Sequence, residues 1–388
     1  MDFNNLKVAF SDKSNSDLNR AYLLFKSISN PTISRILTSL LKIFLWLKIP
    51  ISTIIKATVF KHFCGGTTIQ DSQKTIEFLW KSKIGTILDY SAEGKKSEKD
   101  FNHVMEETIQ TIYKAKSETS IPFSVFKFTG LTHISLLEKL SLELPLSKME
   151  ENEKKNFVNR VENICKTAAE NKVPIFIDAE ESWIQEAIDH LTLEMMRKFN
   201  KKGCWIYNTI QMYRKDRLNY LDKIIQISTK EKFFLGLKIV RGAYHQKEIE
   251  RSKEKEYPTP VHLNKADTDR DYNEALKICI KNSKSISICA GTHNEKSSLL
   301  LSKLIKKNGF NKNDERFYFS QLLGMSDHIS YNLSKNGYNV AKYVPYGPVK
   351  EVIPYLIRRA EENTSISGQM GRELSNLLSE KKRRKYQN

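Results

Sequence analysis

The chain has 388 residues, 40% apolar and 28% charged, so it can bury a large core and has the composition of an ordinary globular protein, not a disordered or fibrous one. Its formal net charge at pH 7 is +18, but the lysines are scattered along the whole sequence. This scatter argues against a nucleic-acid partner, because binding to phosphates favours lysines and arginines clustered on one face.

Residues 1–84 are expected to form an N-terminal helical segment that packs on the main domain. The segment opens MDFNNLKVAFSDKSNSD, which has no pattern of a secretory signal, and no transit peptide is visible. Residues 33–60 are the most apolar part of the chain, but Lys42, Lys48 and Pro50 interrupt them as a membrane span. We expect helices that pack on a core there, with a face for peripheral membrane association as the alternative.

From residue 85 onward, short β-rich runs alternate with amphipathic helical stretches. Eight such runs separated by helices predict a (βα)8 barrel of the TIM type, because open doubly wound sheets more often have five or six strands. We assign the barrel to residues 85–365 and expect the basic tail, 366–388, to be disordered. The expected strands are 85–90, 122–128, 173–180, 204–210, 234–240, 286–291, 316–323 and 339–346.

Polar side chains stand at or just past the ends of these strands, which is where active sites of such barrels lie. A turn would need only Gly, Asn or Ser at these places. A long charged connection, 247–270, is either a solvated loop or a lid over the site. The polar residues at strand ends are Asp89, Lys127, Asp178, Glu180, Gln211, Lys238, Arg241, Tyr244, Thr292, His293, Asn294, Gln321 and Tyr343.

The run IFIDAEES ends a strand in three carboxylates, Asp178, Glu180 and Glu181. Such a group can supply a general acid and base, bind a divalent ion, or cap the following helix. No metal site is predicted from it.

The run RGAYHQKE follows a buried strand. Gly242 would let the backbone approach a ligand, and Arg241 and Lys238 would supply charge for a cofactor phosphate or a reduced ring. A loop glycine between surface charges is the alternative. The run GTHNEKS suits phosphate or adenine-ribose contacts at a helix N-terminus. GxGxxG is absent, so a Rossmann fingerprint would not hold a flavin or nicotinamide here.

The stretch YVPYGPVKEVIPYLIRRAEEN, residues 343–363, is expected to end the last strand and form a helix. Positions i, i+3 and i+4 share one helix face, so Tyr355, Arg358 and Arg359 can point at the same small volume. An aromatic ring and two guanidinium groups suit a carboxylate on a small ring. Two solvated arginines near a helix C-terminus are the alternative.

In this order, GTILDYSAE, FIDAEESWIQEAIDHLTLEMMRKFN, LKIVRGAY, GTHNEKS and YVPYGPVKEVIPYLIRRAEEN resemble the proline dehydrogenase family, particularly its eukaryotic branch. The resemblance runs from the first ten residues to about residue 365. It implies a distorted (βα)8 barrel with N-terminal helices and a final helix over an FAD cofactor. Family enzymes oxidise L-proline to Δ1-pyrroline-5-carboxylate by hydride transfer from C5 to flavin N5, pass the electrons to a membrane quinone, and in eukaryotes usually act in the mitochondrion.

The resemblance also implies roles for residues at matching positions. Bacterial members carry Arg where this chain has Lys238, whereas eukaryotic members resemble this chain there. The substrate site would use Arg358 and Arg359 at the carboxylate, Tyr343 and Tyr355 at the pyrrolidine ring, and Lys127 and Asp178 beside the substrate. The FAD site would use Gln211, Lys238, Arg241, Gly242, Thr292, His293, Asn294, Gln321 and Glu362.

Two alternatives to a proline dehydrogenase stay open at this point. The hydroxyproline dehydrogenase branch of the same family is similar, but tends to have a smaller residue where Tyr343 stands. A non-catalytic basic barrel that acts as a scaffold is a more remote alternative, and the retention of every candidate site residue argues against it.

Overall fold

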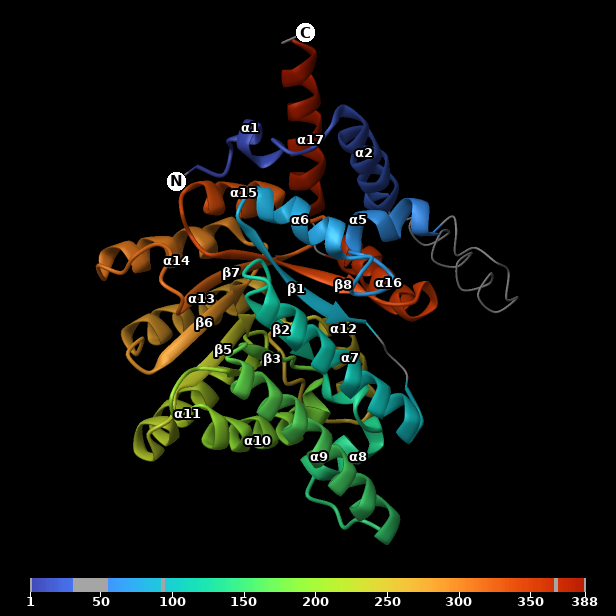
Figure 1. Cartoon of the computed structure of the whole chain (residues 1–388), viewed down its shortest axis with the longest axis vertical. Coiled ribbons are helices and arrows are strands. Elements are labelled where there is room, and N and C mark those ends of the chain that lie inside the picture. Colours follow the sequence, from blue (N-terminus) through green and yellow to red (C-terminus); the bar gives the residue numbers. More distant parts are fainter. Residues whose placement is uncertain (1, 31–54, 92–94, 366–368, 387–388) are drawn as a thin grey trace.

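The fold is described from a computed structural model of the chain (Figure 1). The structure describes residues 2–30, 55–91, 95–365 and 369–386. The side chains of residue 57, of residues 359–365 and of residues 369 and 370 lie outside the description. Most of the apolar stretch 33–60 therefore also falls outside the described residues.

Eight parallel strands close into one barrel, in the sequential order β1 to β8, and β8 pairs with β1. The predicted (βα)8 fold is confirmed. The strands are rich in Ile, Val, Leu and Phe, and almost all of their residues are buried because both faces are covered. They are β1 Ile84–Tyr90, β2 Phe123–Phe126, β3 Ile175–Ile177, β4 Ile206–Gln211, β5 Leu235–Val240, β6 Ile286–Gly291, β7 Phe317–Leu322 and β8 Val340–Tyr346.

Helices follow the strands and form an outer layer around the barrel (Figure 1). Their apolar faces pack against the outward-facing residues of the strands in one large cluster. These helices are α7 Glu98–Ser117, α8 Ile134–Ser141, α9 Lys148–Asn171, α10 Ser182–Phe199, α11 Arg217–Glu231, α12 His245–Glu254, α13 Lys265–Lys281, α14 Glu295–Lys307, α15 Asp327–Lys335 and α16 Val349–Ser365, with a short 3-10 helix η2 Phe128–Gly130 after β2.

Inward-facing aromatic residues fill the barrel interior. The rings of Phe123 and Phe176 stack with their centroids 4.4 Å apart, and Tyr207 meets the Phe123 ring edge-on at 5.5 Å. Tyr343 belongs to the same cluster, and its ring lies parallel to that of Phe176 at 6.3 Å. The interior is therefore a packed floor beneath the carboxyl ends of the strands.

Strand lengths differ from the prediction chiefly at β3, which spans three residues instead of the expected eight. Asp178 is thus the first residue after the strand, and Glu180 and Glu181 lie in the turn before α10. The connection 247–270 also differs, because most of it is helical: α12 covers its start and α13 its end.

The N-terminal segment contributes α1 Leu6–Ala9, α2 Asn15–Ser29, a turn of π-helix η1 Lys56–Phe60, α5 Lys61–Phe63 and α6 Gln73–Lys81. The disordered tail expected over 366–388 is corrected by the structure, since Gln369–Lys385 form helix α17. This helix packs beside α2 and α1, where Leu377 is buried and Arg384 donates to the carbonyl oxygens of Phe10 and Lys13 at 2.8 Å each. The composition of this segment did not predict the helix, because its lysines and arginines outnumber the few apolar residues that it buries.

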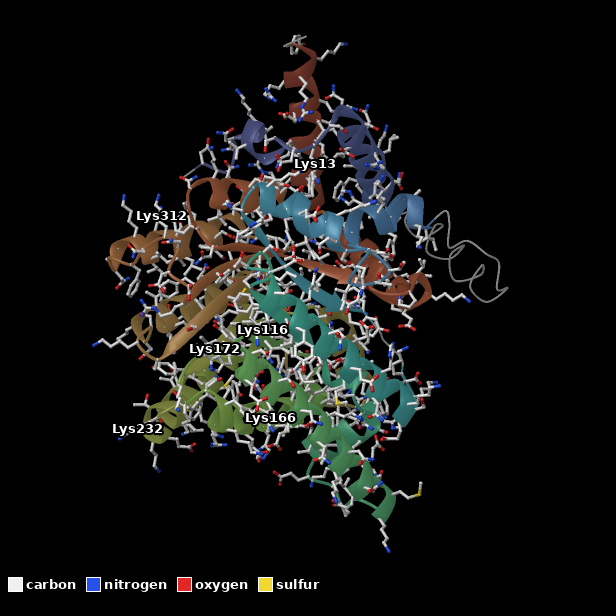
Figure 2. All side chains as sticks on the ribbon, viewed as in Figure 1. Lys13, Lys116, Lys166, Lys172, Lys232 and Lys312 are labelled. Atoms are coloured by element: carbon white, nitrogen blue, oxygen red, sulfur yellow. The ribbon has the colours of Figure 1, made fainter. Side chains whose placement is uncertain are left out.

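The basic charge is distributed over the outside of the molecule. Figure 2 shows labelled lysines on several elements, among them Lys13, Lys232 and Lys312. Across the residues that can be described, no helix is both long and apolar enough to cross a membrane.

Candidate active site

A group of buried charges lies at the carboxyl ends of β1, β2, β3, β5 and β8. Asp178 contacts two lysines: Lys238 from β5 donates a hydrogen bond to Asp178 Oδ1, and Lys127 Nζ, just after β2, lies 3.7 Å from Asp178 Oδ2. Lys238 is 5% exposed and Asp178 9% exposed, so their charges are largely shielded from water. The closed barrel brings together residues 60 positions apart that no local pattern could pair.

Tyr343, in β8, completes this group. Its hydroxyl accepts a hydrogen bond from Lys238 Nζ at 2.6 Å and donates one to Asp178 Oδ1 at 3.0 Å. Lys238 Nζ also lies 4.5 Å from the centre of the Tyr343 ring and 5.3 Å from that of Phe176. The lysine is therefore held by a carboxylate, a hydroxyl and two aromatic faces.

Electrostatics fix the protonation states of this group. Burial opposes ionisation of Asp178, but the positive charges of Lys238 and Lys127 outweigh it and lower the pKa of the carboxyl below its ordinary value. Burial, reinforced by the negative charge of Asp178, raises the pKa of Tyr343 well above 10. At neutral pH the site thus holds an ionised carboxylate beside a neutral phenol.

Asp89 also belongs to this group. The sequence placed it among the polar residues at strand ends but assigned it to neither the substrate site nor the FAD site. Both of its carboxylate oxygens accept hydrogen bonds from Lys127 Nζ, at 3.1 and 3.2 Å. Lys127 is consequently held between Asp89 and Asp178. The position of Asp89 near the end of β1 could have pointed to the site. Its partner, Lys127, is identified only when β1 pairs with its neighbours in the barrel.

Glu180 and Glu181 do not join Asp178 as a metal site. The Glu180 carboxylate accepts hydrogen bonds from the Thr129 amide at 3.1 Å and from the Thr129 hydroxyl, and Glu181 pairs with Lys247. Burial, with the nearby charge of Glu181, raises the pKa of Glu180 to about 7. In the described part of the chain, no cluster of His, Cys, Asp and Glu side chains has the makings of a metal site.

A second group of candidate residues gathers at the ends of β5 and β6. Arg241 donates to the Thr292 hydroxyl at 2.6 Å, to Ser297 Oγ at 2.9 Å and to Asp269 Oδ1 at 2.7 Å. Asn294 caps α14 by accepting from the Ser297 amide at 3.0 Å. The guanidinium group is thereby fixed beside the N-terminus of a helix.

His293 and Gln321 extend this second group towards β7. Gln321 donates to the Thr292 carbonyl oxygen at 3.0 Å and accepts from Ser330 Oγ at 2.7 Å. The Nδ1 atom of His293 lies 2.9 Å from Ser326 Oγ, in the connection between β7 and α15. Four of the nine predicted cofactor residues, Arg241, Thr292, Asn294 and Gln321, therefore form one hydrogen-bonded network.

One observation, at Gln211, fits a bound cofactor at this end of the barrel, and the turn after β5 is separately restricted to glycine. The Gln211 side chain is 3% exposed, and its Oε1 has no hydrogen-bond partner among the described residues. A buried unpaired amide oxygen is costly unless a ligand supplies a donor. At Gly242, φ is +127°, and a Cβ atom would lie 2.4 Å from the Tyr213 ring, so only glycine fits there.

Helix α12 covers the neighbouring turn. Glu248, which is fully buried, accepts hydrogen bonds from the amide of Ser182 at 2.7 Å and from its hydroxyl, and so caps α10 from another helix. The guanidinium carbon of Arg251 lies 4.3 Å from the centre of the Trp183 ring. These contacts tie α12 down over the turn that follows Asp178.

The structure does not place Tyr355 of α16 in the same cluster as Tyr343, although the family resemblance assigns both to the substrate site. Tyr355 is buried in an apolar cluster with residues of α2, α5 and α17, whereas Tyr343 lies in the barrel interior. Leu322, at the end of β7, packs against both clusters, so the two adjoin. Arg358 is half-buried, and the side chains of Arg359 and Glu362 lie outside the described residues.

Comparisons with known proteins show which family this chain is similar to. A family model described as proline dehydrogenase matches residues 72–372. The chain is 37% identical to proline dehydrogenase 1, mitochondrial, of Dictyostelium discoideum, over 97% of this chain and 74% of that protein. It is 34% identical to the carbapenem antibiotics biosynthesis protein CarD of Pectobacterium carotovorum, over 93% of this chain and 94% of the relative. It is 28% identical to hydroxyproline dehydrogenase of Xenopus laevis, over 97% and 89% of the two chains.

Solved structures share the fold. Proline utilization A of Bdellovibrio bacteriovorus, inactivated by N-propargylglycine, aligns with a TM-score of 0.74 at 19% identity, over 95% of this chain. The aligned part is 40% of that longer chain. The same protein of Bradyrhizobium japonicum aligns with a TM-score of 0.67 over 82% of this chain and 32% of that one.

Proposed function

The chain belongs to the proline dehydrogenase family, and from this premise we propose that it is an FAD-dependent enzyme that oxidises L-proline to Δ1-pyrroline-5-carboxylate. The observation that carries the proposal is the buried group of Asp178, Lys238, Lys127 and Tyr343 at the carboxyl ends of the strands. It supplies fixed charges of both signs within an aromatic pocket floor, which suits a small zwitterion.

The substrate carboxylate is assigned to Arg358 and Arg359, as the family resemblance implies. Guanidinium groups bind carboxylates through paired hydrogen bonds, each worth roughly 1.5–3 kcal/mol. Such a clamp would fix the ring in one orientation, and Tyr343 and Tyr355 would restrict its remaining freedom. Positioning of this kind lowers the barrier because the reacting atoms start close together.

The charged group controls the proton on the substrate nitrogen. Asp178 has a lowered pKa, so it is a weak base that stays ionised and holds a cation nearby. Oxidation at C5 requires the nitrogen lone pair, which must therefore be unprotonated when the hydride leaves. Lys127 and Lys238 favour this neutral amine because an added positive charge beside them is disfavoured.

FAD is assigned to a different part of the site from the substrate carboxylate. The residues proposed to line or support it are Gln211, Lys238, Arg241, Gly242, Thr292, His293, Asn294, Gln321 and Glu362. Bound FAD would accept the hydride from C5 at its N5 position. The fixed positive charges of Lys238 and Arg241 would stabilise the negative charge that this transfer creates. The electron acceptor is assigned as a membrane quinone.

A flavin spectrum of the purified protein tests the proposal. We expect absorption bands of bound FAD, and we expect L-proline to bleach them under anaerobic conditions, since the reduced flavin cannot pass on its electrons. A protein that stays colourless and cannot be reconstituted with FAD would contradict the proposal.

Hydroxyproline is the second candidate substrate, because a hydroxyproline dehydrogenase is among the relatives. The buried Tyr343 ring favours proline, since it leaves less room for a ring hydroxyl. Comparison of kcat/KM for the two substrates decides between them, and we expect proline to be at least about 10-fold better, as for one disfavoured group in a close-fitting pocket.

The proposed place of action is the matrix side of the mitochondrial inner membrane, with peripheral membrane association. The support is that relatives from Dictyostelium, Drosophila, Arabidopsis and humans carry mitochondrial names. Fractionation of cells that produce the protein, with detection in washed inner membranes, tests this assignment.

A further inference from the structure

Helix α17 reaches the proposed cofactor site although it follows the barrel in sequence. One side of the helix is buried, with Glu373 4%, Leu377 3% and Glu380 0% exposed. Figure 1 shows the helix running between α1 and α2, and its N-terminal end lies near the connection that leads into α15. Two buried carboxylates, seven residues apart, thus face different parts of the molecule.

Glu373 contacts the connection between β7 and α15. Its Oε1 accepts a hydrogen bond from the backbone amide of Ser326 at 2.6 Å. Ser326 has a left-handed backbone, with φ at +51°, and is fully buried, so its amide needs an acceptor that is fixed in place. The hydroxyl of Ser326 in turn lies 2.9 Å from His293 Nδ1. A short chain of contacts therefore joins α17 to His293.

A second contact leads to the same loop. Arg372 Nε donates to Glu295 Oε1 at 2.8 Å, and the buried His328 lies 3.0 Å from the same oxygen. Glu295 opens α14 and follows Asn294 directly. Arg372 of α17 thus contacts the residue that follows the loop Thr292–Asn294, and Glu373 reaches His293 through Ser326.

We propose that Glu373 is a positioning residue for the cofactor site: it fixes Ser326 and, through Ser326, the ring of His293. The inference rests on the proposed function, because it assumes that His293 supports FAD. Without the carboxylate, the buried Ser326 amide would lose the acceptor that ties it to α17, and the Ser326 side chain would shift relative to His293. The His293 ring would then be held less firmly, and FAD would bind less tightly.

The test compares one substitution at two positions of α17. In Glu373→Ala we expect the Kd for FAD, measured by quenching of flavin fluorescence on the apoprotein, to rise at least about 10-fold, as for loss of a buried polar contact. Glu373→Gln keeps a carbonyl oxygen for the Ser326 amide, so its Kd is expected within about threefold of the unchanged protein. Glu380→Ala is the matched control, because Glu380 is equally buried but pairs with Arg383 and Arg384 at the far end of the helix.

Three outcomes overturn the inference. One is a Kd for FAD in Glu373→Ala within threefold of the unchanged protein, and another is an equal rise in Glu380→Ala, which would mean that general loosening of α17 is the cause. The third is an unchanged chain that binds no FAD at all, which would remove the proposed function as well.

Ser326→Ala provides the independent check, also if Glu373→Ala does not fold. It removes the contact to His293 but retains the backbone, so we expect the Kd for FAD to rise at least about threefold. If both residues act through one route, the double variant binds FAD no worse than the weaker-binding single variant. Effects that multiply, or an unchanged Kd in Ser326→Ala, would contradict the route through Ser326.

Discussion

Asp178 is the residue on which the candidate active site depends. It is the contact point of two lysines and a tyrosine from three different parts of the barrel. Removal of its charge would leave Lys127 and Lys238 as neighbours of like charge, with only Asp89 to balance them. The two lysines would then repel each other and lose the positions from which they act on the substrate nitrogen.

We therefore expect Asp178→Asn to lower kcat/KM for L-proline at least about 100-fold, a loss typical of a group that stabilises charge in a buried site. Steady-state kinetics check this. Asp222→Asn serves as the control, because Asp222 is an exposed carboxylate on α11 and its loss should leave kcat/KM unchanged. A loss below threefold in Asp178→Asn would remove Asp178 from the site.

Glu180 gives a prediction about pH. In the folded chain burial and the charge of Glu181 raise its pKa from 4.5 to about 7, so the folded state binds the proton more tightly than the unfolded state. The stability from this group is fully present below pH 4.5 and is lost as the pH rises through 7. The lowered pKa of Asp178 has the opposite effect, but only below pH 3.8.

Glu180→Gln should remove this dependence. We expect the Tm of the variant, relative to the unchanged protein, to rise between pH 5 and pH 8 by on the order of 2–4 °C, which for a chain of this length corresponds to about 2–3 kcal/mol. Thermal unfolding followed by circular dichroism at several pH values measures it. Histidines titrate in the same range but are common to both proteins, so a difference that stays constant with pH would speak against a protonated Glu180.

At the scale of elements, the turn between β5 and α12 is the part that local geometry constrains most. Gly242 has a positive φ, and a Cβ atom there would lie 2.4 Å from the Tyr213 ring, while Glu248 of the following helix α12 caps α10. One short segment therefore determines where the backbone beside Arg241 runs. The sequence indicated that Gly242 matters for the local backbone, but it did not indicate that the Tyr213 ring lies beside it.

Gly242→Ala should destabilise the fold by about 3 kcal/mol or more, since an unfavourable backbone conformation and overpacking both contribute. Gly309→Ala is the matched control, because Gly309 also has a positive φ, +73°, but nothing lies within 4 Å of its added Cβ. That variant should lose only about 1 kcal/mol. Urea unfolding measures both, and equal losses would show that the Tyr213 ring moves aside at no cost.

The sequence predicted the barrel strands better than it predicted the elements outside the barrel. The apolar runs identified all eight strands, because burial on both faces leaves a clear signature in sequence. The helix α17 was missed, because its few buried residues are spread among lysines and arginines. Its stability comes from contacts with α1, α2 and the connection before α15, which only the folded chain provides.

At the scale of the whole molecule, charge and the apolar segment bear on membrane association. The lysines labelled in Figure 2 are distributed over several elements of the molecule, so they do not mark out one membrane-binding face. The sequence of residues 33–60 is the remaining candidate, and Phe44 and Trp46, separated only by Leu45, are large aromatic residues within it. Aromatic side chains of this kind favour the membrane interface.

Replacement of Phe44 and Trp46 by Ser should reduce binding to phosphatidylcholine vesicles about 10-fold or more, since two large apolar groups are lost. Co-sedimentation with vesicles measures this, and flavin content checks that the barrel is intact. Tyr113→Ser is the control, because Tyr113 is an aromatic residue on α7 that is 48% exposed. Equal losses in both would mean that the segment has no special role.

The sequence by itself determined the barrel, the carboxyl-end position of the polar residues and the family, because alternation of strands and helices and the long motifs are properties of the chain order. It also placed Asp178, Lys238 and Tyr343 among the candidates. Only the tertiary structure decided how they pair, that Asp89 holds Lys127, and that Glu373 contacts Ser326. These partners are 38 to 165 residues apart along the chain, and a hydrogen bond between such residues exists only once the strands close and the outer helices pack.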